Sequence, residues 1–134
     1  GRPQGMILCD THTAVWWLAG ATRLPRGALH AISTATVIGF SAASLWEVAI
    51  KVGKYGPGID PELTLLLTEF ERAGMPAGFE LIPITPADCF SVTRLPAYHG
   101  DPFDRMIIAQ ALERDLTIVS NDRAFDAYGV KRIW

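Results

Sequence analysis

The sequence of 134 residues lacks the features that mark several common protein classes. It has no apolar run of 18 residues, so no membrane-spanning helix is expected. It has only two cysteines, Cys9 and Cys89, and neither belongs to a CxxC pair or to a Cys/His set with zinc-ligand spacing. We therefore expect two buried, reduced thiols and no structural zinc site.

An excess of positive charge is also missing. Twelve Lys and Arg against 14 Asp and Glu give a formal net charge of −2. A protein that holds nucleic acid by bulk charge alone would be basic, so the composition argues against that class. A nuclease is still compatible with this charge, because bound divalent cations would add positive charge at its site.

The start of the sequence, GRPQG, lacks the long apolar core of a secretory signal peptide. Met6 is a candidate natural start. We expect residues 1–5 to be a disordered or non-native extension and residues 6–134 to form a single domain, a length that suffices for a sizeable core. With no export signal, the expected compartment is the cytoplasm.

Short apolar runs alternate along the chain with helical segments. Strands are expected at 6–10, 36–41, 79–84, 116–120 and 130–134. Helices are expected at 11–20, 25–35, 42–54, 60–73, 85–95, from 101 onward and at 122–128. This alternation predicts an α/β fold with a mainly parallel sheet that is covered on both faces.

Local signals refine these elements. Thr11 can cap the first helix, and the Thr85–Asp88 spacing predicts a capping box. Pro83 predicts that the strand at 79–84 is short or lies at an edge, because proline cannot donate to a neighbouring strand.

Four acidic residues lie at the ends of apolar runs or inside apolar helices: Asp10, Glu47, Asp104 and Asp122. Ligands of parallel α/β sheets collect beyond the carboxyl ends of the strands, where Asp10 and Asp122 fall. Four carboxylates brought together would repel one another unless a hard cation lay between them. The pattern therefore predicts a divalent-metal site and chemistry on phosphate.

Each acid also has an ordinary structural interpretation. Asp10, Asp101 and Asp122 can cap helices, and Glu47 can pair with Lys51 four residues later. It is the joint placement of four acids from four segments that favours a site.

Polar neighbours of these acids are candidates for supporting roles. Thr11 and Ser120 can orient a carboxylate or cap a helix. His12 and His99 flank the acids and are candidates for a substrate or proton role, beside the alternative that they are isolated histidines.

Four segments of the sequence resemble those of a known family. The segments LCDTHTAVWWLAG, SAASLWEVAIK, HGDPFDRMIIAQAL and LTIVSNDRAFDAYGVKRIW, in this order over residues 6–134, are similar to PIN domains, and more narrowly to VapC-type toxins of bacterial type II toxin–antitoxin systems. The resemblance implies a three-layer α/β/α sandwich and an endoribonuclease that depends on Mg²⁺ or Mn²⁺. It also implies an RNA substrate, a cognate antitoxin and a homodimer.

By this resemblance the family acids correspond to Asp10, Glu47, Asp104 and Asp122. Asp101 is a frequent companion in the DPFDR subgroup, with a structural role. Arg105 and Arg123 directly follow two of the acids and can contact phosphate, or can be solvated or ion-paired helix residues. The expected reaction is hydrolysis of RNA phosphodiester bonds, in which the cation activates water and stabilises phosphate charge.

Other functions fit parts of the pattern. A receiver-type signalling domain usually needs adjacent acids after its first strand and a lysine after its last, and this chain has a single Asp10 and ends at VKRIW. A non-catalytic α/β binding module would use all the acids as caps. A PIN nuclease with a DNA or RNA-maturation role would have the same site.

The helix expected at 62–73 carries more apolar residues than one core face needs: Leu63, Leu65, Leu66, Leu67 and Phe70. We expect another chain to cover part of this surface, together with surface around Trp16, Trp17 or Trp46.

Overall fold

Five parallel strands form one sheet in the computed structural model, which describes residues 5–20 and 22–134. The strands are β1 (Met6–Cys9), β2 (Val37–Ser41), β3 (Phe79–Ile82), β4 (Thr117–Val119) and β5 (Arg132–Ile133). Their order is β3-β2-β1-β4-β5, and every neighbouring pair is parallel. The edge position predicted for the strand at 79–84 is confirmed. Residues 1–4 of the expected N-terminal extension lie outside the described residues.

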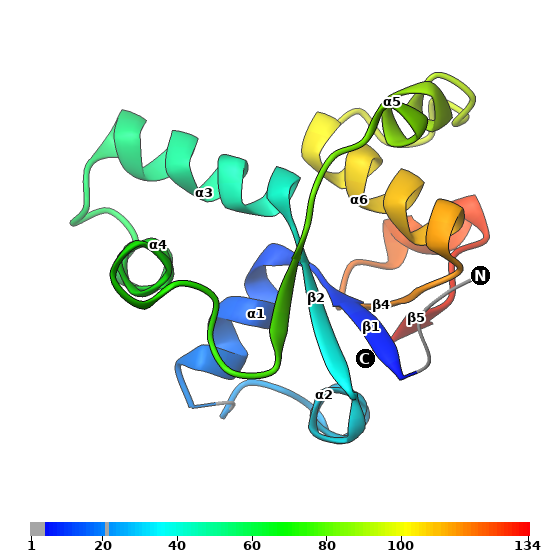
Figure 1. The fold of residues 1–134 in the computed structure, drawn as a ribbon. Coiled ribbons are helices and arrows are strands. Elements are labelled where there is room, and N and C mark those ends of the chain that lie inside the picture. The colour runs from blue at the N-terminus through cyan, green and yellow to red at the C-terminus, as the bar shows by residue number, and fades with distance from the viewer. Residues whose placement is uncertain (1–4, 21) are drawn as a thin grey trace.

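Helices follow the strands in the predicted alternation (Figure 1). They are α1 (Thr11–Leu18), α2 (Arg26–Thr34), α3 (Ala42–Tyr55), α4 (Pro61–Ala73), α5 (Pro86–Val92), α6 (Pro102–Arg114) and the short 3₁₀ helix η1 (Arg123–Tyr128). None of the helices within the described ranges is long and apolar enough to span a membrane.

Two apolar clusters pack against opposite faces of the sheet. Successive residues of β1 point to opposite sides, so Cys9 joins the cluster under α1, α2 and α4, and Leu8 joins the cluster under α6 and η1. The expected α/β/α sandwich is therefore confirmed, with α5 and α6 on one side of the sheet and α1, α2 and α4 on the other (Figure 1).

Aspartates cap four of the helical segments. Asp10, Asp60, Asp101 and Asp122 each accept a hydrogen bond from a backbone N–H of the turn that follows. The prediction that Thr11 caps α1 is wrong, because Asp10 takes this position and leaves the Thr11 hydroxyl free for another partner. The capping box of Thr85 and Asp88 is confirmed.

One of the two thiols differs from expectation. Cys9 is buried, and its burial raises the pKa of its thiol far above the ordinary value. The negative charge of Asp10 makes a smaller contribution in the same direction. Cys89 is exposed, so the prediction of a second buried thiol is wrong. It lies on the outward face of α5, which turns Asp88 rather than Cys89 toward the protein interior.

A buried polar network docks α5 against α6. Asp88 is only 1% exposed and accepts hydrogen bonds from Arg114 Nη1 at 2.7 Å and Nη2 at 3.1 Å, and from Gln110 Nε2 at 3.2 Å. Burial by itself would raise the pKa of Asp88, but these donors and the Thr85 N–H outweigh it, so the pKa lies below the ordinary value. Asp88 is therefore held as a carboxylate.

Candidate metal centre

Four acids from four separate elements line one cavity of about 340 Å³. Asp10 ends β1, Glu47 lies in the middle of α3, Asp104 is in the first turn of α6, and Asp122 caps η1 after β4. Because the strands are parallel, their carboxyl ends meet at one edge of the sheet, and the helices that follow begin there. The remaining lining residues are Thr11, His12 and Asn121.

Three donors surround the Asp10 carboxylate. Its Oδ1 accepts the Thr13 N–H at 3.0 Å and lies 2.6 Å from the Thr13 hydroxyl. Its Oδ2 accepts a hydrogen bond from Ser120 Oγ, and the same Ser120 oxygen accepts the Asp122 N–H at 3.0 Å. The buried Ser120 hydroxyl thus ties the first acid to the loop that carries the fourth.

Glu47 is oriented from two sides. Its Oε1 accepts a hydrogen bond from Thr11 Oγ1 at 3.0 Å, and its Oε2 lies 3.3 Å from Lys51 Nζ. The Lys51 pair is the ordinary interpretation that the sequence offered for Glu47. Although it is paired with Lys51, Glu47 still lines the cavity beside Asp10 and Asp104.

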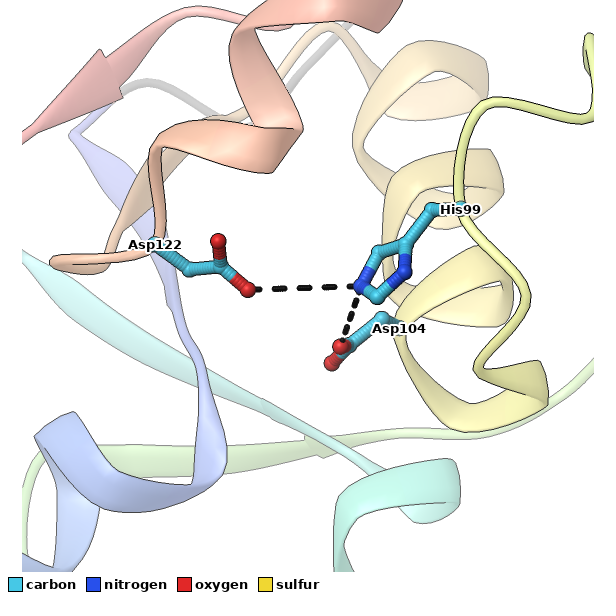
Figure 2. A group of neighbouring side chains, drawn as sticks. All are labelled: His99, Asp104 and Asp122. Carbon is cyan, nitrogen blue, oxygen red and sulfur yellow. Dashed lines mark hydrogen bonds and ion pairs between the residues drawn. The ribbon is translucent and has the colours of Figure 1, made fainter.

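Asp104 and Asp122 share a neighbour, His99 (Figure 2). His99 Nε2 lies 2.8 Å from Asp104 Oδ2 and 4.0 Å from Asp122 Oδ2. Burial of the Asp104 carboxyl raises its pKa to about 6, and repulsion by Asp101 and Glu47 adds to this, although the contact with His99 acts in the opposite direction. The raised pKa of Asp104 is therefore mainly an effect of burial, to which the neighbouring carboxylates add.

Two of the predicted supporting residues face elsewhere. Asp101 accepts the N–H groups of Phe103 at 2.8 Å and Asp104 at 3.0 Å, so it caps α6. The guanidinium of Arg105 donates to backbone carbonyls in the segment 92–99, at distances of 2.8 to 3.3 Å. Arg105 therefore holds the loop before α6, a role different from the phosphate contact considered from the sequence.

Two further residues of this centre escaped the sequence analysis. Thr13 lies three residues after Asp10, the spacing of a residue that meets an N-cap side chain, and this spacing was the available signal. Asn121 lies between Ser120 and Asp122 and lines the cavity, but one asparagine in a loop carries no signal of its own.

The donor set fits a hard divalent cation. Four carboxylates offer oxygen ligands, and Mg²⁺ needs only a few of them because it keeps several waters. Neighbouring hydroxyls from Thr11, Thr13 and Ser120 already hold two of the carboxylates in place.

The raised pKa of Asp104 predicts a pH-dependent cost of folding in the absence of metal. The folded state keeps this proton up to about pH 6, whereas an unfolded chain releases it near 3.8. Between these values the folded state binds more protons, so stability falls as pH rises. Since the Asp104 side chain is 24% exposed, we expect a cost of about 2 kcal/mol above pH 6.

Urea unfolding with a chelator checks this prediction. Asp104→Asn is expected to be about as stable as the wild type at pH 4 and about 2 kcal/mol more stable at pH 7. An equal difference between the two proteins at both pH values would contradict a raised pKa at this position.

The fold and the cavity together define a class of protein: a parallel α/β/α domain whose carboxylates gather at the carboxyl edge of the sheet. The model of the PIN domain matches residues 7–131. The chain belongs to the PIN-domain family, which confirms the resemblance seen in the sequence.

Individual relatives agree with this assignment. The chain is 33% identical over 121 residues to Ribonuclease VapC22 of Mycobacterium tuberculosis, and the match covers 87% of each chain. Among solved structures, FitAcB from Neisseria gonorrhoeae matches with a TM-score of 0.68 and 20% identity, over 95% of this chain and 96% of that one. VapBC-5 from M. tuberculosis, of the VapBC family of toxin–antitoxin systems, matches with a TM-score of 0.65 and 16% identity, over 96% and 97%.

Proposed function

We propose that this protein is a divalent-metal-dependent endoribonuclease that acts in the cytoplasm as the toxin of a toxin–antitoxin pair. The observation that carries the proposal is the meeting of Asp10, Glu47, Asp104 and Asp122 in one cavity. The 33% identity to Ribonuclease VapC22 supports RNA as the substrate.

In this proposal the four acids hold Mg²⁺ or Mn²⁺, some of them through water. When bound, the cation activates water for attack on phosphorus and neutralises charge on the phosphate. Ser120 and Thr13 keep the Asp10 carboxylate in a single orientation, and Thr11 does the same for Glu47. Such preorganisation means that the acids need little rearrangement when metal and RNA arrive.

Charge explains why the cation is needed. Four carboxylates lining one small cavity repel a phosphodiester, and the positive charge of Lys51 is already paired with Glu47. Bound divalent cations would reverse the sign of the local field and make the cavity attractive to RNA.

The main alternative, a binding module whose acids are all helix caps, explains only part of the cluster. Asp10 and Asp122 do cap helices. Glu47 lies in the middle of α3, where it caps nothing, and its side chain is only 13% exposed. A purely structural role accounts for its contacts with Thr11 and Lys51, whereas a cation site also accounts for its place in the cavity beside Asp10 and Asp104.

Heat stability tests the metal site independently of RNA. At a free Mn²⁺ concentration tenfold above its Kd, the wild type should gain about 1.4 kcal/mol and melt several degrees higher. The triple variant Asp10→Asn/Glu47→Gln/Asp104→Asn should gain nothing. RNA cleavage should accompany the metal and stop with a chelator. Absence of any Mn²⁺ or Mg²⁺ stabilisation in the wild type would favour the binding module.

The partners proposed are a second copy of the chain and an antitoxin. Exposed apolar side chains support this. Trp46 of α3 is 61% exposed. Leu65 of α4 is 49% exposed, whereas Leu63, Leu66 and Phe70 of the same helix are buried in the core. An apolar cavity of about 440 Å³ lies beside Trp46 and Phe103, next to α3 and α6, which also carry two of the acids.

We expect light scattering to give the mass of two chains. The expected effect of the antitoxin is loss of RNA cleavage, because an arginine from it that reached the carboxylates would compete with the cation. A monomer at tens of micromolar, unchanged on raising salt, would contradict the dimer and leave the nuclease proposal intact.

A further inference from the structure

His99 places an imidazole nitrogen beside two of the four acids, Asp104 and Asp122. It belongs to the loop between α5 and α6, and its side chain is 23% exposed, about as much as that of Asp104. Figure 2 shows that both contacts, to Asp104 and to Asp122, meet at the same ring nitrogen. His99 therefore lies between two of the carboxylates, each from a different element.

The spacing of these three atoms is that of ligands around one ion. One atom each from His99, Asp104 and Asp122 lie within 4.8 Å of one another, with Nε2 at 2.8 Å and 4.0 Å from the two carboxylate oxygens. Ligands bound at about 2.1 Å to a common cation lie roughly 3 to 4 Å apart, depending on the angle between them. A small movement of the side chains would be enough to admit the ion.

The loop that carries His99 is held in place by α6 and η1. The His99 N–H donates to the Tyr128 hydroxyl at 2.8 Å, and this hydroxyl donates to the Pro96 carbonyl at 2.9 Å. Arg105 Nη1 lies 2.8 Å from the Pro96 carbonyl and 3.3 Å from that of His99. The imidazole ring also lies beside Phe125, with ring centroids 6.5 Å apart and planes inclined by 51°. The backbone of His99 is thus held in place before a cation binds, so that only its side chain has to adjust.

We propose that His99 is a ligand of the divalent cation through Nε2, together with Asp104 and Asp122, and that the site therefore prefers Mn²⁺ to Mg²⁺. Mg²⁺ binds almost entirely through oxygen, whereas the affinity of first-row transition metals for nitrogen ligands rises from Mn²⁺ onward. The inference rests on the proposed cation site and adds to it a nitrogen ligand and a metal preference.

Metal binding, measured without RNA, tests this inference. The metal-free full-length protein, free of any histidine tag, is titrated with Mn²⁺ by electron paramagnetic resonance and with Mg²⁺ by competition. His99→Gln can still donate a hydrogen bond to Asp104 but offers no imidazole. We expect its Mn²⁺ affinity to fall about tenfold or more, the scale seen when groups around a metal are removed, and its Mg²⁺ affinity to fall much less.

Pulsed electron paramagnetic resonance of bound Mn²⁺ provides a spectroscopic signature of a nitrogen ligand. A His99 that only positioned Asp104 would not give this signature. The chain has three histidines, so the double variant His12→Gln/His30→Gln retains only His99. Bound Mn²⁺ in this variant should show imidazole nitrogen coupling, and bound Mn²⁺ in His99→Gln should not. The double variant also keeps the inference testable if His99→Gln does not fold.

Three results would overturn the inference. They are equal losses of Mn²⁺ and Mg²⁺ affinity in His99→Gln, a nitrogen signal that persists in His99→Gln, and the absence of that signal from the double variant. In each case a wild type that still binds a divalent cation leaves the proposed function standing. A wild type that binds neither cation overturns both.

Discussion

Replacing Asp104 by asparagine is expected to lower metal-dependent RNA cleavage by at least about 100-fold, the scale on which a single preorganised electrostatic group contributes to a transition state. The change removes one negative charge from the cavity but keeps the shape of the side chain and its ability to contact His99 at 2.8 Å. Because the pKa of Asp104 is raised to about 6, its ionised form destabilises the folded state at neutral pH. The variant should therefore be at least as stable as the wild type at this pH.

Single-turnover cleavage of RNA at saturating Mg²⁺ or Mn²⁺ measures this effect. Asp60→Asn is the matched control, because Asp60 caps α4 in the same way but does not line the acidic cavity. We expect the control to cleave RNA at the wild-type rate. Wild-type cleavage by Asp104→Asn would show that the metal centre is assigned wrongly.

Replacing Arg114 by methionine is expected to lower the free energy of unfolding by about 3 kcal/mol, the lower end of the cost of leaving a buried charge unpaired. Asp88, at 1% exposure, would lose both hydrogen bonds from the guanidinium, whereas the methionine would keep most of the packing of the arginine stem. The Arg114 side chain is itself 24% exposed, so we do not expect the upper end of that range.

The effect also has a defined pH dependence. The pKa of Asp88 is lowered in the folded state, so the stability that its ionised form provides is present at neutral pH and is lost as pH falls through that lowered value. The gap between wild type and Arg114→Met should therefore narrow in acid. Chemical denaturation at several pH values measures it.

Arg72→Met is the matched control, because Arg72 forms an exposed pair with Glu69 on the surface of α4. Such pairs contribute little, and the control should leave stability almost unchanged. A loss in Arg114→Met no larger than in this control would mean that the network of Asp88 does not hold α5 on α6.

Several side chains illustrate how far sequence reasoning reaches. Asp10 and Asp122 were placed together correctly because parallel strands end at one edge, which is a property of the fold class and needs no coordinates. Asp88 was recognised only as part of a capping box, and its pairing with Arg114, 26 positions away, gave no local signal. Cys89 was placed inside because it is apolar, but the orientation of α5 turns it outward.

The sequence by itself determined the alternation of strands and helices, the edge position of β3, the capping box of Thr85 and Asp88, and the acids that meet at the cavity. These features depend on hydrophobic period, on proline and on short-range hydrogen bonds, all of which are local. Only the tertiary structure decided that His99 contacts Asp104 and Asp122 and that Arg105 holds the loop of His99. Such contacts depend on how separate helices are oriented in space, because one nitrogen reaches two carboxylates only when a loop, α6 and η1 pack at particular angles.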